Sequence, residues 1–229
     1  MALRDFKRTM MLPMRVWDAP TRLFHWAIVL LVLVSFVSVQ AGWMRLHLLS
    51  GFTVLALLLF RLVWGFIGSE TSRFRQFLVS PTKGLHHLSK FREPTPDTQV
   101  GHNEAGGWMV VALLALLGVQ VLSGLFNTEE YGASYAAAGP LVKYVSKGVA
   151  SFAGIVHGVT FTLLLLLIVL HILTILAYGL VKKHDLVRPM ITGVKRLPAA
   201  TRQPRMASPI LAGAVLAVAI VISWLVATL

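Results

Sequence analysis

Five long stretches without charge dominate the pattern of polar and apolar residues along the chain. A helix crosses the hydrocarbon core of a bilayer with about 20 consecutive apolar residues, and each of the five stretches allows such a span. They are residues 23–44, residues 46–69 with Arg61 as the one charge, and residues 105–128, 148–181 and 206–229. The pattern therefore predicts an all-α membrane protein with five transmembrane helices.

The composition agrees with a membrane location, because 56% of the residues are hydrophobic and only 13% are charged. These values lie outside the range of soluble globular domains. The first apolar stretch is too long for the core of a secretory signal and lacks a small-residue cleavage site, so we expect it to remain in the protein. The chain contains no cysteine. Disulfides, thiolate-held iron–sulfur clusters and covalent attachment of c-type haem are therefore excluded.

Capping and turn residues divide the chain into segments. Asp18 and Pro20 are typical of a helix start, and Gly42 with Trp43 indicates a very short turn between the first two helices. A polar loop precedes the third helix, which we expect to begin near Trp108. The expected segments are an N-terminal arm (1–22), a four-helix domain (23–181), a basic linker (182–208) and a separate fifth helix (209–229).

The net charge of +12 comes from basic residues that lie mainly on one side of the predicted spans. Lys and Arg gather on the cytoplasmic side of membrane proteins. This side holds Arg4, Lys7, Arg8, Arg15, Arg22, Arg73, Arg75, Lys83, Lys90, Arg92, Lys182, Lys183, Arg188, Lys195, Arg196, Arg202 and Arg205, and the opposite side holds Arg45, Lys143 and Lys147. We therefore expect a cytoplasmic N-terminus, an outer C-terminus, and binding to membrane lipid but not to nucleic acid.

Four of the eight histidines, His25, His47, His157 and His171, fall within predicted spans. An ionisable residue inside a bilayer is costly and marks a candidate functional site. His157 and His171 are 14 residues apart, close to four helical turns, so they share one helix face at two depths about 21 Å apart. The remaining histidines, for which we expect solvated loop positions, are His86, His87, His102 and His184.

The order of the helices predicts which histidines meet. His47 begins the second helix at the outer side, where His157 also lies, whereas His25 and His171 lie at the inner side. Each depth thus offers two neutral imidazoles facing each other across the helices, as bis-histidine haem iron requires. The absence of thiols and inward carboxylates disfavours a zinc site or a proton relay.

Residues near these histidines have two readings each. Glycines close to the ligands either leave room for a flat macrocycle or serve helix packing, and they are Gly51, Gly154 and Gly158. Arg61, 14 residues after His47, either binds a haem propionate or extends to the cytoplasmic interface. Arg22 has the same two readings, and the positive-inside pattern favours an anchor at the interface.

Several motifs together resemble bacterial cytochrome b561. They are VWDAPTRLFHW (Val16–Trp26), the run from His47 to Gly68 with RLVWGFIG, GHNEAGGWM (Gly101–Met109), the paired His157 and His171, and RPMITG (Arg188–Gly193). The resemblance covers roughly residues 14–197. Glu104 and Ala105 replace the proline and aliphatic residue expected in the third of these motifs, and the fifth helix is additional to the family's usual core.

The resemblance implies a four-helix bundle holding two non-covalent b haems in the bacterial inner membrane, with ligands from the first, second and fourth helices. It also implies electron exchange between the quinone pool and a periplasmic partner, either a hydrogenase-like subunit or a c-type cytochrome. A quinone contact is expected near Asn103, whose other reading is a cap of the third helix. Alternatives are a stand-alone superoxide or quinone oxidoreductase and an intramembrane-histidine metal transporter, and a homo-oligomer is compatible with each.

Overall fold

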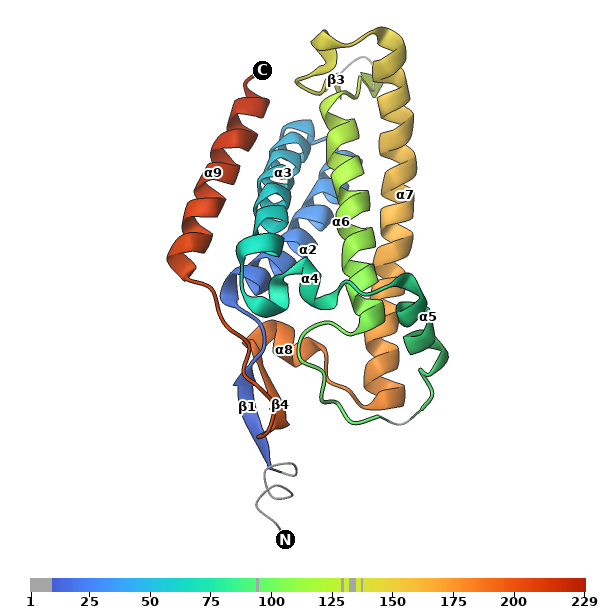
Figure 1. Ribbon diagram of the computed structural model, residues 1–229. Coiled ribbons are helices and arrows are strands. Elements are labelled where there is room, and N and C mark those ends of the chain that lie inside the picture. The colour runs from blue at the N-terminus through green and yellow to red at the C-terminus, as the bar shows by residue number, and fades with distance from the viewer. Residues whose placement is uncertain (1–9, 94, 129, 132–134, 137) are drawn as a thin grey trace. The chain divides into compact units, whose positions relative to one another are not determined.

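The computed structural model describes residues 10–93, 95–128, 130, 131, 135, 136 and 138–229. Arg4, Lys7 and Arg8, which contribute to the predicted orientation, lie outside the described residues. Five helices are long and apolar enough to cross a membrane. They are α2 (Ala19–Gln40), α3 (Met44–Ile67), α6 (Glu104–Leu125), α7 (Lys147–Ala177, continued by a π-helical turn η3, Tyr178–Lys182) and α9 (Pro209–Ala227). This confirms the all-α membrane fold with an added C-terminal helix (Figure 1).

Shorter elements precede or connect the five long helices. They are β1 (Met11–Arg15), η1 (Glu70–Ser72), α4 (Phe74–Phe77), α5 (Pro81–Ser89), β2 (Glu130–Tyr131), β3 (Tyr135–Ala136), η2 (Val142–Tyr144), α8 (Val187–Thr192) and β4 (Val194–Pro198). The chain divides into two compact units. The strand unit comprises Met1–Leu23, Val63–Val111 and Leu170–Ala212, and the cavity unit comprises Phe24–Leu62, Ala112–Val169 and Gly213–Leu229.

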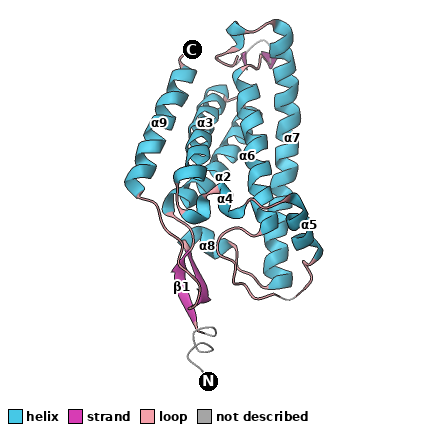
Figure 2. Ribbon diagram, in the orientation of Figure 1, coloured by secondary structure: helices cyan, strands magenta, loops and turns pink. Residues whose placement is uncertain are grey.

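In the strand unit, β1 and β4 form an antiparallel pair that the sequence pattern did not predict (Figure 2). Gly193, at φ +81°, ends α8 in a left-handed conformation, and its carbonyl accepts a hydrogen bond from the Val16 N–H at 2.8 Å. Val16, Trp17 and Leu197 form a small buried cluster beside the pair. Within residues 182–208, expected as a linker, residues 187–192 form α8 and residues 194–198 form β4.

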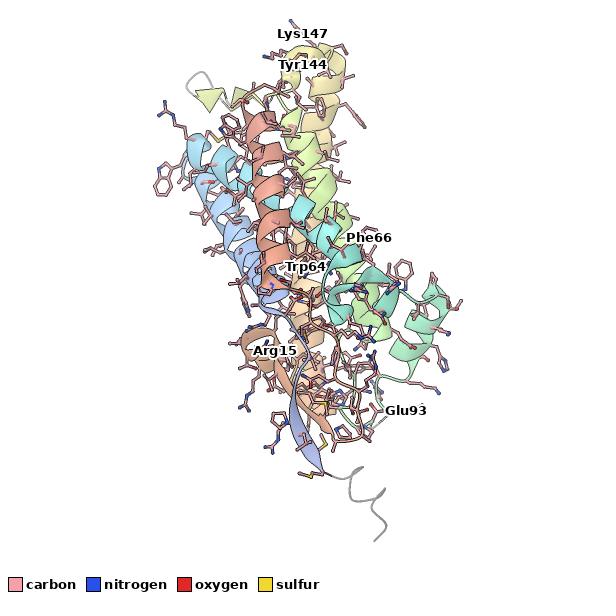
Figure 3. The ribbon with its side chains drawn as sticks, turned by 60° about the vertical axis from the view of Figure 1, so that its left-hand side comes forward. Arg15, Trp64, Phe66, Glu93, Tyr144 and Lys147 are labelled. Carbon is pink, nitrogen blue, oxygen red and sulfur yellow. The ribbon has the colours of Figure 1, made fainter. Side chains whose placement is uncertain are left out.

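The start of α2 is held by a buried polar network in the strand unit. The Asp18 carboxylate accepts from the Thr21 N–H at 2.7 Å, which confirms Asp18 as the helix cap. It also accepts from the Trp64 indole N–H at 3.0 Å. Trp64 is fully buried, whereas Phe66, two residues later, is 72% exposed and projects outward (Figure 3). The first turn of α2 is thus tied to the end of α3.

In the cavity unit, segments of α2, α3, α6 and α7 lie alongside one another (Figure 1). Their buried contacts centre on Val54, Leu58, Leu117 and Leu164. The segment of α9 in this unit contacts α3. The buried hydroxyl of Ser223 on α9 donates to the Phe52 carbonyl on α3 at 2.6 Å. The fifth helix therefore contacts the backbone of the helix that carries His47.

Candidate functional site

A cavity in the cavity unit is lined by α2, α3, α6 and α7. Its walls are mostly apolar, with residues such as Val32, Phe36, Leu117 and Phe161. His47 and His157 also line it, one from the first turn of α3 and the other from α7. An apolar cavity with a few convergent polar groups is the usual form of a cofactor site.

The ring of His47 is held by α2. Its Nδ1 atom lies 3.0 Å from the Ser35 carbonyl oxygen and 3.2 Å from the Ser35 hydroxyl. A carbonyl oxygen only accepts hydrogen bonds, so Nδ1 carries the proton and donates it. In a neutral imidazole the lone pair is then on Nε2, the atom that serves as a metal ligand.

The ring of His157 is held in the same manner by α6. Its Nδ1 donates to the Gln120 carbonyl oxygen at 2.9 Å, and the Ser123 hydroxyl lies 3.3 Å away. The side-chain amide of Gln120 donates to His157 Nε2 at 3.0 Å, which agrees with a lone pair on that nitrogen. The Gln120 Oε1 atom is buried and has no hydrogen-bond partner within the described chain.

The two imidazoles are close enough to share one metal atom. Their ring centres are 6.3 Å apart, and half of this separation is about 3.2 Å. A metal–imidazole bond is about 2 Å long, and the distance from a ring nitrogen to the ring centre accounts for the rest. The separation of the two rings therefore suits a shared metal atom, and the Gln120 amide occupies the position at His157 Nε2 that such a metal would take.

Glycines around the cavity leave space for a flat group. A Cβ atom built on Gly51 or Gly158 would meet nothing within 4 Å, and both residues line the cavity. Gly124 is different, because a Cβ there would lie 3.0 Å from the His157 ring. Gly154 is buried within α7. The macrocycle reading is thus supported at Gly51 and Gly158, and the packing reading at Gly154.

The predicted inner pair is divided between the two units. His25 is half-buried on α2 in the cavity unit, and His171 is half-buried on α7 in the strand unit. Their pairing stays a prediction. Among the residues that the structure describes, no three His, Cys, Asp or Glu side chains gather as a metal site.

The two arginines differ in their surroundings. Arg61 is only 2% exposed on α3, which disfavours extension of its guanidinium to the aqueous interface. Arg22 is half-buried, and its guanidinium donates to the Ile191 carbonyl in the strand unit. Arg22 therefore ties the start of α2 to α8, and its predicted role as an anchor at the membrane interface stays a prediction.

Asn103 caps α6. Its side-chain oxygen accepts from the Gly106 N–H at 2.7 Å, and its amide donates to the Tyr178 hydroxyl at 3.1 Å. The helix consequently begins at Glu104, four residues before the expected start at Trp108. The capping reading of Asn103 is confirmed, and a quinone contact there stays a prediction.

Histidines expected in solvated loops are placed differently. His102 packs edge-on against Trp17 and Phe77, with ring centres 4.6 and 4.7 Å away. The side chain of His184 is only 11% exposed, and its Nε2 atom lies 2.8 Å from the Thr95 carbonyl oxygen. His86 is exposed but belongs to helix α5, and the His87 side chain lies outside the described residues. His102 and His184 do lie in loops, as expected, but their side chains are half-buried and packed or hydrogen-bonded rather than solvated.

Sequence reasoning missed the residues that surround the rings of His47 and His157. They are Ser35, Gln120, Ser123 and Gly124. Ser35, Gln120 and Ser123 are polar residues inside otherwise apolar spans, and this was the available signal. Their role depends on which side of each helix faces the neighbouring histidine. The apolar spans in the sequence do not define this orientation.

The apolar helices and the histidine-lined cavity define a multi-pass membrane protein with a site suited to haem. A family model described as prokaryotic cytochrome b561 matches residues 16–193. The chain belongs to this family and is thus a bacterial membrane b-type cytochrome that functions in electron transfer. Comparisons with curated proteins and with solved structures gave no significant match. The matched range ends before α9.

Proposed function

We propose that this cytochrome carries electrons between the quinone pool and a periplasmic redox partner through two b haems. The observation that carries the proposal is the pair His47 and His157, whose rings meet at one cavity with both Nδ1 atoms held by helix carbonyls. Metal-binding histidines are usually oriented in this way. Bound haem supplies reversible one-electron chemistry, and the protein supplies ligands, burial and polar contacts.

The roles of the chain's own residues follow from their positions. His47 and His157 hold the outer haem, while Gly51 leaves space for its ring. His25 and His171 hold the inner haem, in the pairing that the helix order predicts. Arg61 is a buried cation suited to a haem propionate. Arg22, already engaged by the Ile191 carbonyl, is a weaker candidate for the same contact.

The partners are proposed from the family resemblance and the charge distribution. The basic segments favour a cytoplasmic N-terminus and a periplasmic C-terminus in the inner membrane. The periplasmic partner is a hydrogenase-like subunit or a c-type cytochrome. Quinone binds at the inner side, near Asn103. Fusing alkaline phosphatase after Leu229 tests the orientation, because this enzyme is active only if the C-terminus reaches the periplasm.

Haem content tests the proposed function directly. The purified protein should show absorption bands that shift on reduction and should contain two haems per chain, measured as the pyridine haemochrome against protein concentration. His47→Ala should lower this ratio to one. A colourless folded protein contradicts haem binding, and an unchanged ratio in His47→Ala contradicts the ligand assignment.

A further inference from the structure

The hydroxyl of Ser35 lies beside the Nδ1 atom of His47, and a second serine supports it. The Ser50 hydroxyl lies 3.0 Å from the Ser35 hydroxyl oxygen and 2.8 Å from the His47 carbonyl oxygen, and its one proton is shared between these two acceptors. Ser50 is only 2% exposed. The Ser35 oxygen has two lone pairs, so it can also accept from the imidazole N–H at 3.2 Å. The N–H of His47 therefore faces two oxygen acceptors, the Ser35 carbonyl and the Ser35 hydroxyl.

The same arrangement recurs at His157 with residues from another helix. The Ser123 hydroxyl lies 3.3 Å from Nδ1 and donates to the Gln120 carbonyl at 3.0 Å. Ser123 is 8% exposed. Ser35 belongs to α2 and Ser123 to α6, so two separate helices place one carbonyl and one hydroxyl at a ligand N–H. This recurrence indicates that both histidine rings require oxygen acceptors at Nδ1–H.

Oxygen acceptors at Nδ1–H change the ligand strength of an imidazole. They draw the proton away from the ring, raise the basicity of Nε2 and so favour the oxidised form of a bound metal. Hydrogen bonding to axial ligands is one of the means by which proteins adjust haem potentials. Each hydroxyl is therefore expected to lower the midpoint potential of a haem bound at the cavity.

We infer that Ser35 and Ser123 are positioning residues that lower the reduction potential of the outer haem through His47 and His157. The inference rests on the proposed function, because it requires haem between these two ligands. Neither serine is a ligand itself. Each serine fixes the orientation of the neighbouring imidazole and strengthens the bond from the imidazole Nε2 to the haem iron.

Potentiometric titration of the haem absorption bands tests the role of the hydroxyls. Ser35→Ala and Ser123→Ala should each move one haem component to a higher midpoint potential and leave the other component unchanged. Ser35→Thr keeps a hydroxyl and should restore the original potential. Ser223→Ala is the matched control, because Ser223 is also buried and bonded to a helix carbonyl, that of Phe52. Ser223→Ala should leave the midpoint potentials of both haem components unchanged.

The possible outcomes separate this inference from the function on which it rests. Unchanged potentials in both alanine variants, or an equal shift in Ser223→Ala, overturn the inference. Loss of haem from Ser35→Ala but not from Ser35→Thr supports it, whereas loss from both overturns it. His47→Ala is titrated alongside. If it keeps both components, the ligand assignment fails; if it loses one while the serine variants do not shift, only the positioning role fails.

Discussion

In the strand unit, buried polar side chains bond to one another and to backbone distant in sequence, whereas in the cavity unit several of them lie beside two histidine rings. Asp18 accepts from Trp64 and Thr21 in the first case. Ser35 and Ser123 stand beside imidazole nitrogens in the second. Similar hydrogen bonds thus serve two purposes. In the strand unit they satisfy groups that burial would otherwise leave costly, and in the cavity unit they orient the rings of His47 and His157.

Removing a ligand should give the largest effect. His157→Ala is expected to remove one of two haems, because the opposing His47 alone leaves the iron without its second axial ligand. His102→Ala, which changes a histidine packed between aromatic rings of the strand unit, should keep both haems. The haem-to-protein ratio after purification measures the difference. An equal loss in both variants would contradict the assignment of His157 as a haem ligand.

Trp64→Ala should destabilise the protein without abolishing the haem bands. Removing a fully buried indole leaves a void and takes a hydrogen-bond donor from Asp18, at a cost of about 3–5 kcal/mol. Phe66→Ala is the control on the same helix, because Phe66 is largely exposed. Thermal unfolding in detergent should show a large fall in Tm for Trp64→Ala and a small one for Phe66→Ala. Similar falls in both variants would contradict the packing argument.

Glu70 should give a smaller, pH-dependent effect. The pKa of its carboxyl is lowered, first by the hydrogen bond from the Arg205 backbone N–H and then by the Arg202 side chain. A carboxyl whose pKa is lower in the folded protein contributes stability above its unfolded pKa of about 4.3, and this contribution is lost as the pH falls through the folded value. Glu70→Gln should therefore lower Tm at neutral pH and flatten its dependence on pH below about 5.

Glu93→Gln is the control for Glu70, because the Glu93 side chain is exposed (Figure 3). Its Tm should follow that of the unaltered protein over the same pH range. If Glu70→Gln also follows the unaltered curve, the bonds to Arg202 and Arg205 do not contribute to stability in solution.

Removal of the fifth helix should have no effect on the haem spectrum. Deleting residues 205–229 removes α9, which lies beyond the range matched to the family and contains no histidine. The absorption bands of the truncated protein, compared with those of Ser223→Ala, measure the outcome. Disappearance of the bands in the truncated protein would place α9 in the haem-binding core, through its contact with α3.

The sequence predicted the five spans because hydropathy and length are properties of each segment alone. It did not predict the β1–β4 pair, since prolines and charges in both strands interrupt any alternation. The start of α6 was placed too late, because the polar segment before Trp108 was interpreted as a loop. A Cβ on Gly107 would lie 2.6 Å from the Phe77 carbonyl, so that glycine serves close packing within the strand unit.

The site, like the fold, was predicted only in part. Helical spacing and helix order were enough to bring His47 and His157 together. The partners of their Nδ1 atoms could not be found in this way, because these contacts depend on helix rotation and side-chain rotamers. In the sequence, Ser35 and Ser123 do not differ from other small polar residues, and only the structure shows that each lies beside a histidine ring.

The short turn at Gly42 also bears on the order in which the site is assembled. It places Ser35 and His47, only 12 residues apart, on one helical hairpin, whereas Gln120 and His157 are 37 residues apart. Contacts close in sequence form early, and chains fold from the N-terminus as they are synthesised. We expect the hairpin to hold His47 in its ligand orientation as soon as it enters the membrane. The cofactor can then bind only after α7, which carries His157, has entered the membrane.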